Sequence, residues 1–534
     1  MINDLNLKTA DRFSATLVGP YVIAMQEWKK VFLLSLAGVG FRILNCLLFA
    51  NDIVADSDQL RTITLARKFA SGNFYGVLDP YWPPLYPILI GILTYFVDSP
   101  ILPALTISII TGSLAVPLTY YLVKQSYGQR EATLAAVIAI FFPHLINSVF
   151  SFGTENIYLL LVIGALIIGW KGLKRDAVTD YLLTGILLGL AYLTRPEAIG
   201  YLVFFVLLAL GKNLWRRKLF ARNSTTQIGA LLLGFGLLAA PYILYLRSAT
   251  GAWTISAKAQ VNSPLGELRQ IEESETSAAI STTQTGKLFA KYVAHNLIEI
   301  NKNFPFLVPP FLLIFVGLGL FSKQWDKERL RRETYLILFC LVTAMGYALT
   351  VVQARYFYVL LPIFFGWIAS GIILLERWFD KSVQNWMPNK SFYSFNPKFF
   401  TILCVIFIYL YVLPINYFMV PEDKAWHSTA YEERDAGVWL KEHGKPSATI
   451  FSASSRPVFY AEGHHLPPTT TDMGEIFRQI KERRVDYVIT GERSLKRNPY
   501  LKGFTETLQN DPEFELIYEK NEHPGYKIEI FRMK

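Results

Sequence analysis

Long apolar stretches separated by short polar connections make up most of the chain as far as residue 421. A helix that spans a membrane needs about 20 apolar residues. A first span is predicted over 31–50, with Arg42 inside it, and 181–211 predicts two shorter helices that meet at Arg195, Pro196 and Glu197. The other stretches carry no Asp, Glu, Lys or Arg and are 99–123, 132–154, 156–170, 223–246, 303–322, 334–354, 356–375 and 399–421. We therefore expect about eleven spans.

The tail has a different pattern, with many charged residues and short alternating apolar runs. Helical spacing predicts helices over 433–442 and 473–483. Strands are predicted at 448–452, 485–490, 514–519 and 526–531. The predicted fold class is a multi-pass α-helical membrane protein with a small C-terminal α/β domain. Its expected parts are an N-terminal segment 1–30, a membrane domain 31–421 and a domain 425–534 outside the membrane.

Composition excludes several other classes of protein. Hydrophobic residues make up 52% of the chain and charged residues only 18%, against about 25% charged in globular chains. Disorder, collagen and coiled coil are excluded by this composition. The three cysteines, Cys46, Cys340 and Cys404, each lie in an apolar run, so we expect neither a disulfide framework nor a metal site from them.

The distribution of basic residues predicts the orientation in the membrane. Lys and Arg cluster in the alternate loops 124–130, 171–175, 212–222, 323–332 and 377–398. Such an excess marks cytoplasmic loops, so we assign the net charge of +10 to this face and expect no nucleic-acid partner. The N-terminus lies on the same side. The opposite, external side holds the loops 51–100 and 247–302, the ends near Glu155, Arg195 and Arg355, and the C-terminal domain. We expect an inner (plasma) membrane protein.

The first external loop carries most of the candidate chemistry. Asp56 and Asp58 follow the first span, and 59–70 has the apolar spacing of an amphipathic helix at a membrane interface. Tyr81 and Trp82 then precede a Pro-Pro pair, and aromatic residues are typical of the headgroup level. A carboxylate at the mouth of a helix bundle can deprotonate an incoming hydroxyl. The alternative is that these aspartates are solvated loop residues.

The order of these features resembles the first external loop of the polyprenyl-phosphate-sugar-dependent membrane glycosyltransferases. That family includes protein O-mannosyltransferases and lipid A aminoarabinose transferases, and its fold is called C-type. Its pattern is an Asp-Glu pair, an interfacial helix ending in Ala-Arg, and a Pro-Pro pair that opens the next helix. This chain has Asp58 at the first place, then Ala66 and Arg67, then Pro83 and Pro84.

The resemblance implies that Asp58 is the catalytic base, with Asp56 as the alternative if the register is shifted by two. Gln59 replaces the usual Glu, which removes any role that rests on the second acid. Trp82 stands where the aminoarabinose branch has a Lys, which argues against that sugar.

Three further segments resemble the same family, and all are expected on the external side. They are Thr154 with Glu155, the run of residues 193–197 (Leu-Thr-Arg-Pro-Glu), and Arg355 with Tyr356. The resemblance implies a lipid-phosphate donor, whose phosphate suits the planar fork of Arg. Arg195 and Arg355 are therefore the candidate phosphate ligands. Glu155, Tyr81, Trp82 and Tyr356 are candidate contacts of the donor or acceptor.

Each of these residues also has a simpler interpretation. Arg195 could pair with Glu197, and Arg355 could extend toward the membrane surface. Glu155 could only cap a helix N-terminus, where an acid is favourable. Arg42 is expected to pair inside the bundle. His464 and His465 lie near an acid, but their spacing matches no ligand set, so we expect no metal.

The predicted function is transfer of a sugar from a polyprenyl-phosphate donor to an acceptor hydroxyl, with inversion, on the external face. The acceptor could be a glycan, a lipid or a protein. The resemblance implies no nucleotide, and we expect no cofactor. One alternative is a polytopic transporter or lipid flippase with an external domain, although no repeat between the two halves supports it. A membrane-anchored assembly protein is another, but it leaves the pattern of the first loop unexplained.

Overall fold

The computed structural model describes residues 3–49, 57–97, 99, 101–216, 222–258, 282–321, 325–386, 402, 406–407, 410, 430–522 and 526–534. The chain divides into two compact units. The first comprises Met1–Ala50 and Leu65–Pro414, and the second comprises Asn51–Thr64 and Ile415–Lys534.

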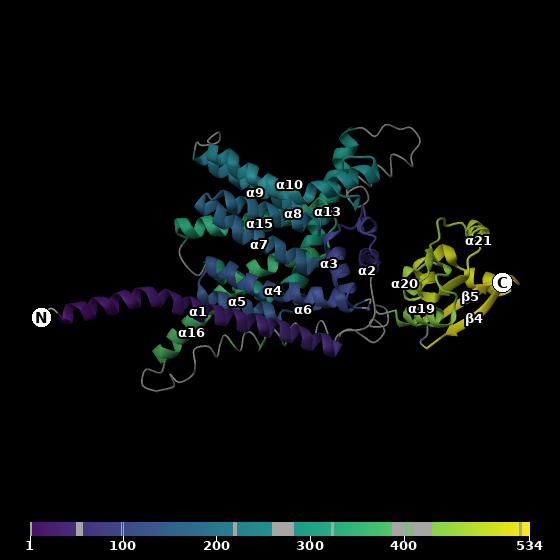
Figure 1. Ribbon diagram of the computed structural model, residues 1–534, viewed down its shortest axis with the longest axis horizontal. Helices are drawn as coiled ribbons and strands as arrows, with labels where there is room; N and C mark the ends of the chain where they lie inside the picture. The colour runs from purple at the N-terminus through teal and green to yellow at the C-terminus, as the bar shows by residue number, and fades with distance from the viewer. Residues whose placement is uncertain are drawn as a thin grey trace. The chain divides into compact units, whose positions relative to one another are not determined.

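The first unit is helical, and Figure 1 shows its longer helices running side by side. Short turns connect most of them. Its elements are α1 (Asn3–Phe49), the later part of α2 (Ser57–Ala70), η1 (Tyr75–Val77), α3 (Leu85–Thr94), α4 (Leu102–Ser126), α5 (Gln129–Phe141), α6 (Pro143–Phe150), α7 (Glu155–Arg175), α8 (Val178–Tyr192), α9 (Ala198–Trp215), α10 (Arg222–Thr250), α13 (Thr282–Leu307), α14 (Pro310–Phe321), α15 (Lys327–Ala348), η2 (Ala354–Leu360) and α16 (Leu361–Trp386).

The residues that the structure describes contain fewer long apolar helices than the eleven spans expected for the whole chain. In the described residues six helices are long and apolar enough to cross a membrane, or up to eight if each bent pair counts as one span. The bent pairs are α5 with α6, at 44°, and α13 with α14, at 91°. Hydropathy alone does not reveal such bends, and α3 and α8 are apolar but short. The expected span at 399–421 lies almost wholly outside the described residues.

The bend between α5 and α6 has a local cause. Pro143 has no backbone N–H, so it cannot bond to the Ala139 carbonyl four residues earlier. The Arg42 side chain of α1 supplies the donor: Nη2 lies 3.4 Å from the Ala139 oxygen, and Nη1 lies 3.2 Å from the Gly38 oxygen. This buried arginine therefore pairs inside the bundle, as expected, with backbone carbonyls as its partners.

Small residues allow neighbouring helices to approach closely. Where α8 crosses α10, a Cβ on Gly185 would lie 2.1 Å from the Leu231 carbonyl oxygen. A Cβ on Gly234 would lie 2.4 Å from the Leu182 oxygen. Contacts this short leave no room for a side chain, as is common where membrane helices pack.

The second unit contains a five-stranded sheet with the order β2-β1-β3-β5-β4. β1 pairs in parallel with β2 and β3, whereas β5 pairs antiparallel with β3 and β4. The elements are β1 (Thr449–Ser452), β2 (His464–Leu466), β3 (Tyr487–Gly491), β4 (Phe514–Lys520) and β5 (Ile528–Met533), with helices α19 (Tyr431–His443), α20 (Ser455–Tyr460), α21 (Met473–Glu482), α22 (Glu492–Arg497), η4 (Pro499–Leu501) and α23 (Phe504–Asn510).

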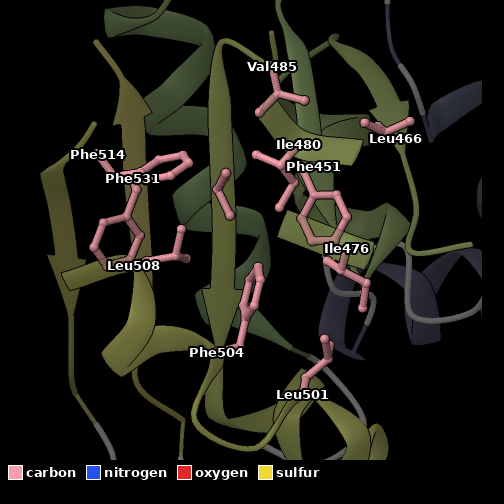
Figure 2. Packing of buried hydrophobic residues seen from close by; sticks show 11 residues of the cluster. Phe451, Leu466, Ile476, Ile480, Val485, Leu501, Phe504, Leu508, Phe514 and Phe531 are labelled. Atoms are coloured by element: carbon pink, nitrogen blue, oxygen red, sulfur yellow. The ribbon is translucent and has the colours of Figure 1, made fainter. Parts of the chain in front are cut away.

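Apolar side chains alternate between the two faces of this sheet. Phe451 and Phe531 belong to one buried cluster, which also includes side chains of α21 and α23 (Figure 2). Ile450 and Ile530, their neighbours along the strands, belong to the cluster with α19 on the other face. A sheet covered on both faces explains why β3 has three successive buried apolar residues, Tyr487, Val488 and Ile489.

Candidate functional site

Three chain segments meet at one end of the first unit. Glu155 is the first residue of α7, Arg195 and Glu197 lie in the break between α8 and α9, and Arg355 lies in η2. The break begins where α8 ends at Tyr192, and the Arg195 N–H donates to the Ala191 carbonyl at 2.7 Å. Sequence reasoning nominated these residues separately, and the structure joins them in one network.

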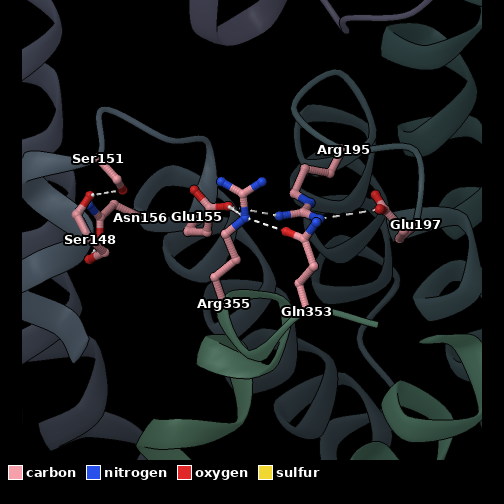
Figure 3. A network of polar contacts seen from close by, with 8 residues as sticks. All are labelled: Ser148, Ser151, Glu155, Asn156, Arg195, Glu197, Gln353 and Arg355. Carbon is pink, nitrogen blue, oxygen red and sulfur yellow. Dashed lines mark hydrogen bonds and ion pairs between the residues drawn. The ribbon is translucent and has the colours of Figure 1, made fainter. Parts of the chain in front are cut away.

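Figure 3 shows the charged side chains of this network. Glu155 Oε1 lies 3.3 Å from Arg195 Nη1 and 3.5 Å from Arg355 Nε. Arg195 Nη2 lies 3.3 Å from Glu197 Oε1, and Arg355 Nε donates to Gln353 Oε1 at 2.7 Å. The exposed fraction is 9% for the Arg195 side chain but 30% for Arg355. Arg355 is therefore the more accessible of the two cations.

The arginine at the centre of the network is stabilised electrostatically. Burial works to raise the pKa of the Glu197 carboxyl, but the neighbouring Arg195 guanidinium outweighs it and holds this pKa below its ordinary value. Burial likewise works to lower the pKa of Arg195, but Glu197 and Glu155 raise it well above its ordinary value. Arg195 and Glu197 are therefore both charged at neutral pH. The ring of Tyr356 lies 4.0 Å from the guanidinium and adds a cation–π contact.

The start of α7 is fixed by neutral hydrogen bonds. The Ser148 hydroxyl donates to Asn156 Oδ1 at 2.7 Å, and Asn156 Nδ2 donates to the Ser148 carbonyl at 3.1 Å. These contacts tie α6 to the residue next to Glu155. Phe152, in the corner between the two helices, has a φ of 42°, a strained conformation for a side chain of this size.

Tyr81 and Trp82 form a second cluster in the first unit. Their backbone N–H groups donate to Asp79 Oδ1 at 2.8 and 3.1 Å. Lys258 Nζ lies 5.0 and 5.4 Å from the two ring centroids, and Lys258 is among the charges that lower the pKa of Glu197. Sequence reasoning missed Asp79 and Lys258, because neither residue stands out in a motif.

Asp58 is the second residue of α2, in the part of that helix that belongs to the second unit. Its side chain is partly buried, and its carbonyl accepts a hydrogen bond from the Thr62 hydroxyl at 2.8 Å. The alternative base, Asp56, lies outside the described residues. Within the part of the chain that the structure describes, no three His, Cys, Asp or Glu side chains are grouped to hold a metal ion.

The helical unit and the small sheet domain agree with the fold class expected from the sequence, and comparisons with known proteins point to membrane glycosyltransferases of the C type. The family model described as dolichyl-phosphate-mannose-protein mannosyltransferase matches residues 82–245. No curated protein matches the chain in sequence. The matched segment contains Glu155, Arg195 and Glu197.

Solved structures of two enzymes are similar to this fold. ArnT from Cupriavidus metallidurans in the apo state has a TM-score of 0.56 at 12% identity, over 95% of this chain and 98% of that one. The same protein bound to undecaprenyl phosphate has a TM-score of 0.54 at 11% identity, over 97% and 98%. The oligosaccharyltransferase of Archaeoglobus fulgidus in the apo form has a TM-score of 0.53 at 14% identity, over 87% of this chain and 69% of that one.

These findings confirm the fold class and the resemblance expected from the sequence. The chain is a multi-pass membrane protein with a small C-terminal sheet domain, and its enzyme class is that of a glycosyltransferase related to enzymes that use lipid-linked donors.

Proposed function

We propose that this enzyme transfers a sugar from a polyprenyl-phosphate donor to an acceptor hydroxyl on the extracytoplasmic face of an inner membrane, with inversion at the anomeric carbon. The observation that supports the proposal most directly is the charged network, because the family match covers the segment that supplies Glu155, Arg195 and Glu197. The positive-inside distribution of basic loops favours an external position for this network.

Arg355 is the residue we assign to the phosphate of the donor. Its side chain is 30% exposed, and its Nε is held by Gln353 and lies near Glu155, so the guanidinium is positioned at the accessible edge of the network. A guanidinium makes paired, charge-assisted bonds to phosphate oxygens. Arg195 lies behind it as a second, more buried positive charge that stabilises the departing phosphate.

Asp58 is our candidate for the general base. It takes the proton of the acceptor hydroxyl while the hydroxyl oxygen attacks the anomeric carbon. The bond between that carbon and the phosphate oxygen breaks, and its electron pair leaves with the lipid phosphate. One displacement of this kind inverts the configuration. Tyr81, Trp82 and Tyr356 are proposed contacts of the sugar or the acceptor, and the C-terminal domain, 425–534, is proposed to bind the acceptor.

The first experiment is mass spectrometry of polyprenyl-phosphate sugars in cells that lack the gene, complemented with wild type, Asp58→Asn or the matched control Asp56→Asn. We expect one lipid-linked sugar to accumulate without the gene and with Asp58→Asn, but not with wild type or Asp56→Asn. Accumulation with Asp56→Asn alone would move the base to that residue. An unchanged pool in a strain known to make such donors would overturn the proposal and favour transport.

A further inference from the structure

Four buried polar atoms around Arg195 have no hydrogen-bond partner among the residues that the structure describes. They are Oε2 of Glu155, Oε2 of Glu197 and the hydroxyls of Tyr158 and Tyr347. Buried polar groups are paired in the great majority of cases, so a cluster of four is unusual. Tyr158 and Tyr347 are each 3% exposed and Glu155 is 6% exposed.

The four atoms share one neighbourhood. Each carboxylate binds Arg195 through its Oε1 atom, and Oε2 is the oxygen without a partner among the described residues (Figure 3). Tyr158 lies one helical turn beyond Glu155 on α7, and its ring is 5.5 Å from the Arg195 guanidinium. Tyr347 stacks on Tyr356, whose ring also lies against Arg195, with the two ring centroids 5.3 Å apart.

The chemistry of these atoms selects one kind of ligand. Ionised carboxylate oxygens only accept hydrogen bonds, whereas a phenol hydroxyl both donates and accepts. A phosphate also only accepts and is negative, so it cannot satisfy Glu155 or Glu197. A sugar ring offers several hydroxyls that donate and accept. Arg195 is bound by both acids, so besides adding positive charge behind Arg355 it holds the two carboxylates in place.

We propose that Glu155, Glu197, Tyr158 and Tyr347 form the subsite for the hydroxyls of the donor sugar, with Arg195 as the positioning residue. This inference rests on the proposed function, in which Arg355 binds the phosphate. Because the sugar is attached directly to that phosphate, a phosphate on Arg355 places the sugar beside Glu155, whose Oε1 lies 3.5 Å from Arg355 Nε.

The test compares lipids that copurify with the enzyme from its own cells. Native mass spectrometry measures the ratio of polyprenyl-phosphate sugar to bare polyprenyl phosphate, in an Asp58→Asn background that retains the donor. Tyr158→Phe and Tyr347→Phe keep the rings and remove one hydroxyl each. We expect each to lower the ratio by about three- to tenfold, the size of one buried hydrogen bond, whereas Arg355→Gln removes both lipids.

Tyr201→Phe is the matched control, because the Tyr201 hydroxyl is already hydrogen-bonded to Thr343 Oγ1 at 3.1 Å. Its removal leaves the ratio unchanged. If Tyr158→Phe and Tyr347→Phe also leave the ratio unchanged, bound water alone occupies these atoms and the inference is overturned, while the proposed function stands. If wild type carries neither lipid, the proposed function itself fails.

Discussion

The substitution Glu155→Gln tests the charged network most directly, because one carboxylate oxygen serves two arginines. Two unit charges 3.3 Å apart attract by roughly 5 kcal/mol at an effective dielectric constant of about 20. Removing one partner of a buried pair costs about 3–5 kcal/mol, but Arg195 retains Glu197 as a counter-charge, so we expect about 2–3 kcal/mol. The contact with the 30% exposed Arg355 adds no more than about 1 kcal/mol.

The assay is a pair of double-mutant cycles on the free energy of unfolding, measured at equilibrium in lipid–detergent micelles. One cycle combines Glu155→Gln with Arg195→Gln, and the other combines it with Arg355→Gln. The first coupling energy should exceed the second by about 1–2 kcal/mol, because only Arg195 is as buried as its partner. Equal couplings, or a neutral Glu155→Gln, would refute the view that burial sets the strength of this network.

Three further predictions concern packing and pH. Gly185→Leu should destabilise the folded protein by at least the roughly 1–3 kcal/mol of ordinary overpacking, and so sharply reduce the yield of folded protein in size-exclusion chromatography. Gly236→Leu should not, because a Cβ there meets nothing within 4 Å. Asn156→Ala removes two buried hydrogen bonds and should cost about 1–3 kcal/mol in the same unfolding assay; no loss would contradict its role at α7. Burial works to raise the pKa of Asp486, but Lys445 and the Thr449 N–H lower it below its ordinary value. Its stabilisation is therefore present above about pH 4 and lost as the pH falls further. Hydrogen exchange of β3 should show a smaller acid-induced loss in Asp486→Asn than in wild type.

The sequence predicts those features of the fold that depend on neighbouring residues better than those that depend on contacts between distant parts of the chain. Local signals predicted the break at Arg195, the helix 473–483 and the buried strand 485–490, because periodicity and Pro act over a few residues. The three-residue strand β2 gave no periodic signal. Hydropathy could not show the bends next to Pro143 and Pro309, which lower the number of straight spans.

The candidate site shows the same limit. Glu155, Arg195 and Arg355 could be nominated from the sequence, because charged residues at the ends of apolar runs stand out. The pairing of Glu155 with the two arginines could not be predicted, since 40 residues separate Glu155 from Arg195 in the chain. Tyr158 and Tyr347 lay hidden in apolar stretches, where a phenol looks like any other aromatic residue. Their importance appears only when the partners of each buried atom are known.

The contact between Arg42 and the Ala139 carbonyl has a consequence for biogenesis. Synthesis proceeds from the N-terminus, so α1 enters the membrane before α5 and α6 are made. The Ala139 carbonyl, which Pro143 leaves without a helical donor, would be costly to expose to lipid. Its donor, the Arg42 side chain, is already present on α1 when that carbonyl is made. The first helix thus supplies the hydrogen-bond donor that the later bend needs. A chain that lacks the N-terminal residues up to and including Arg42 should insert its helices but fail to assemble them.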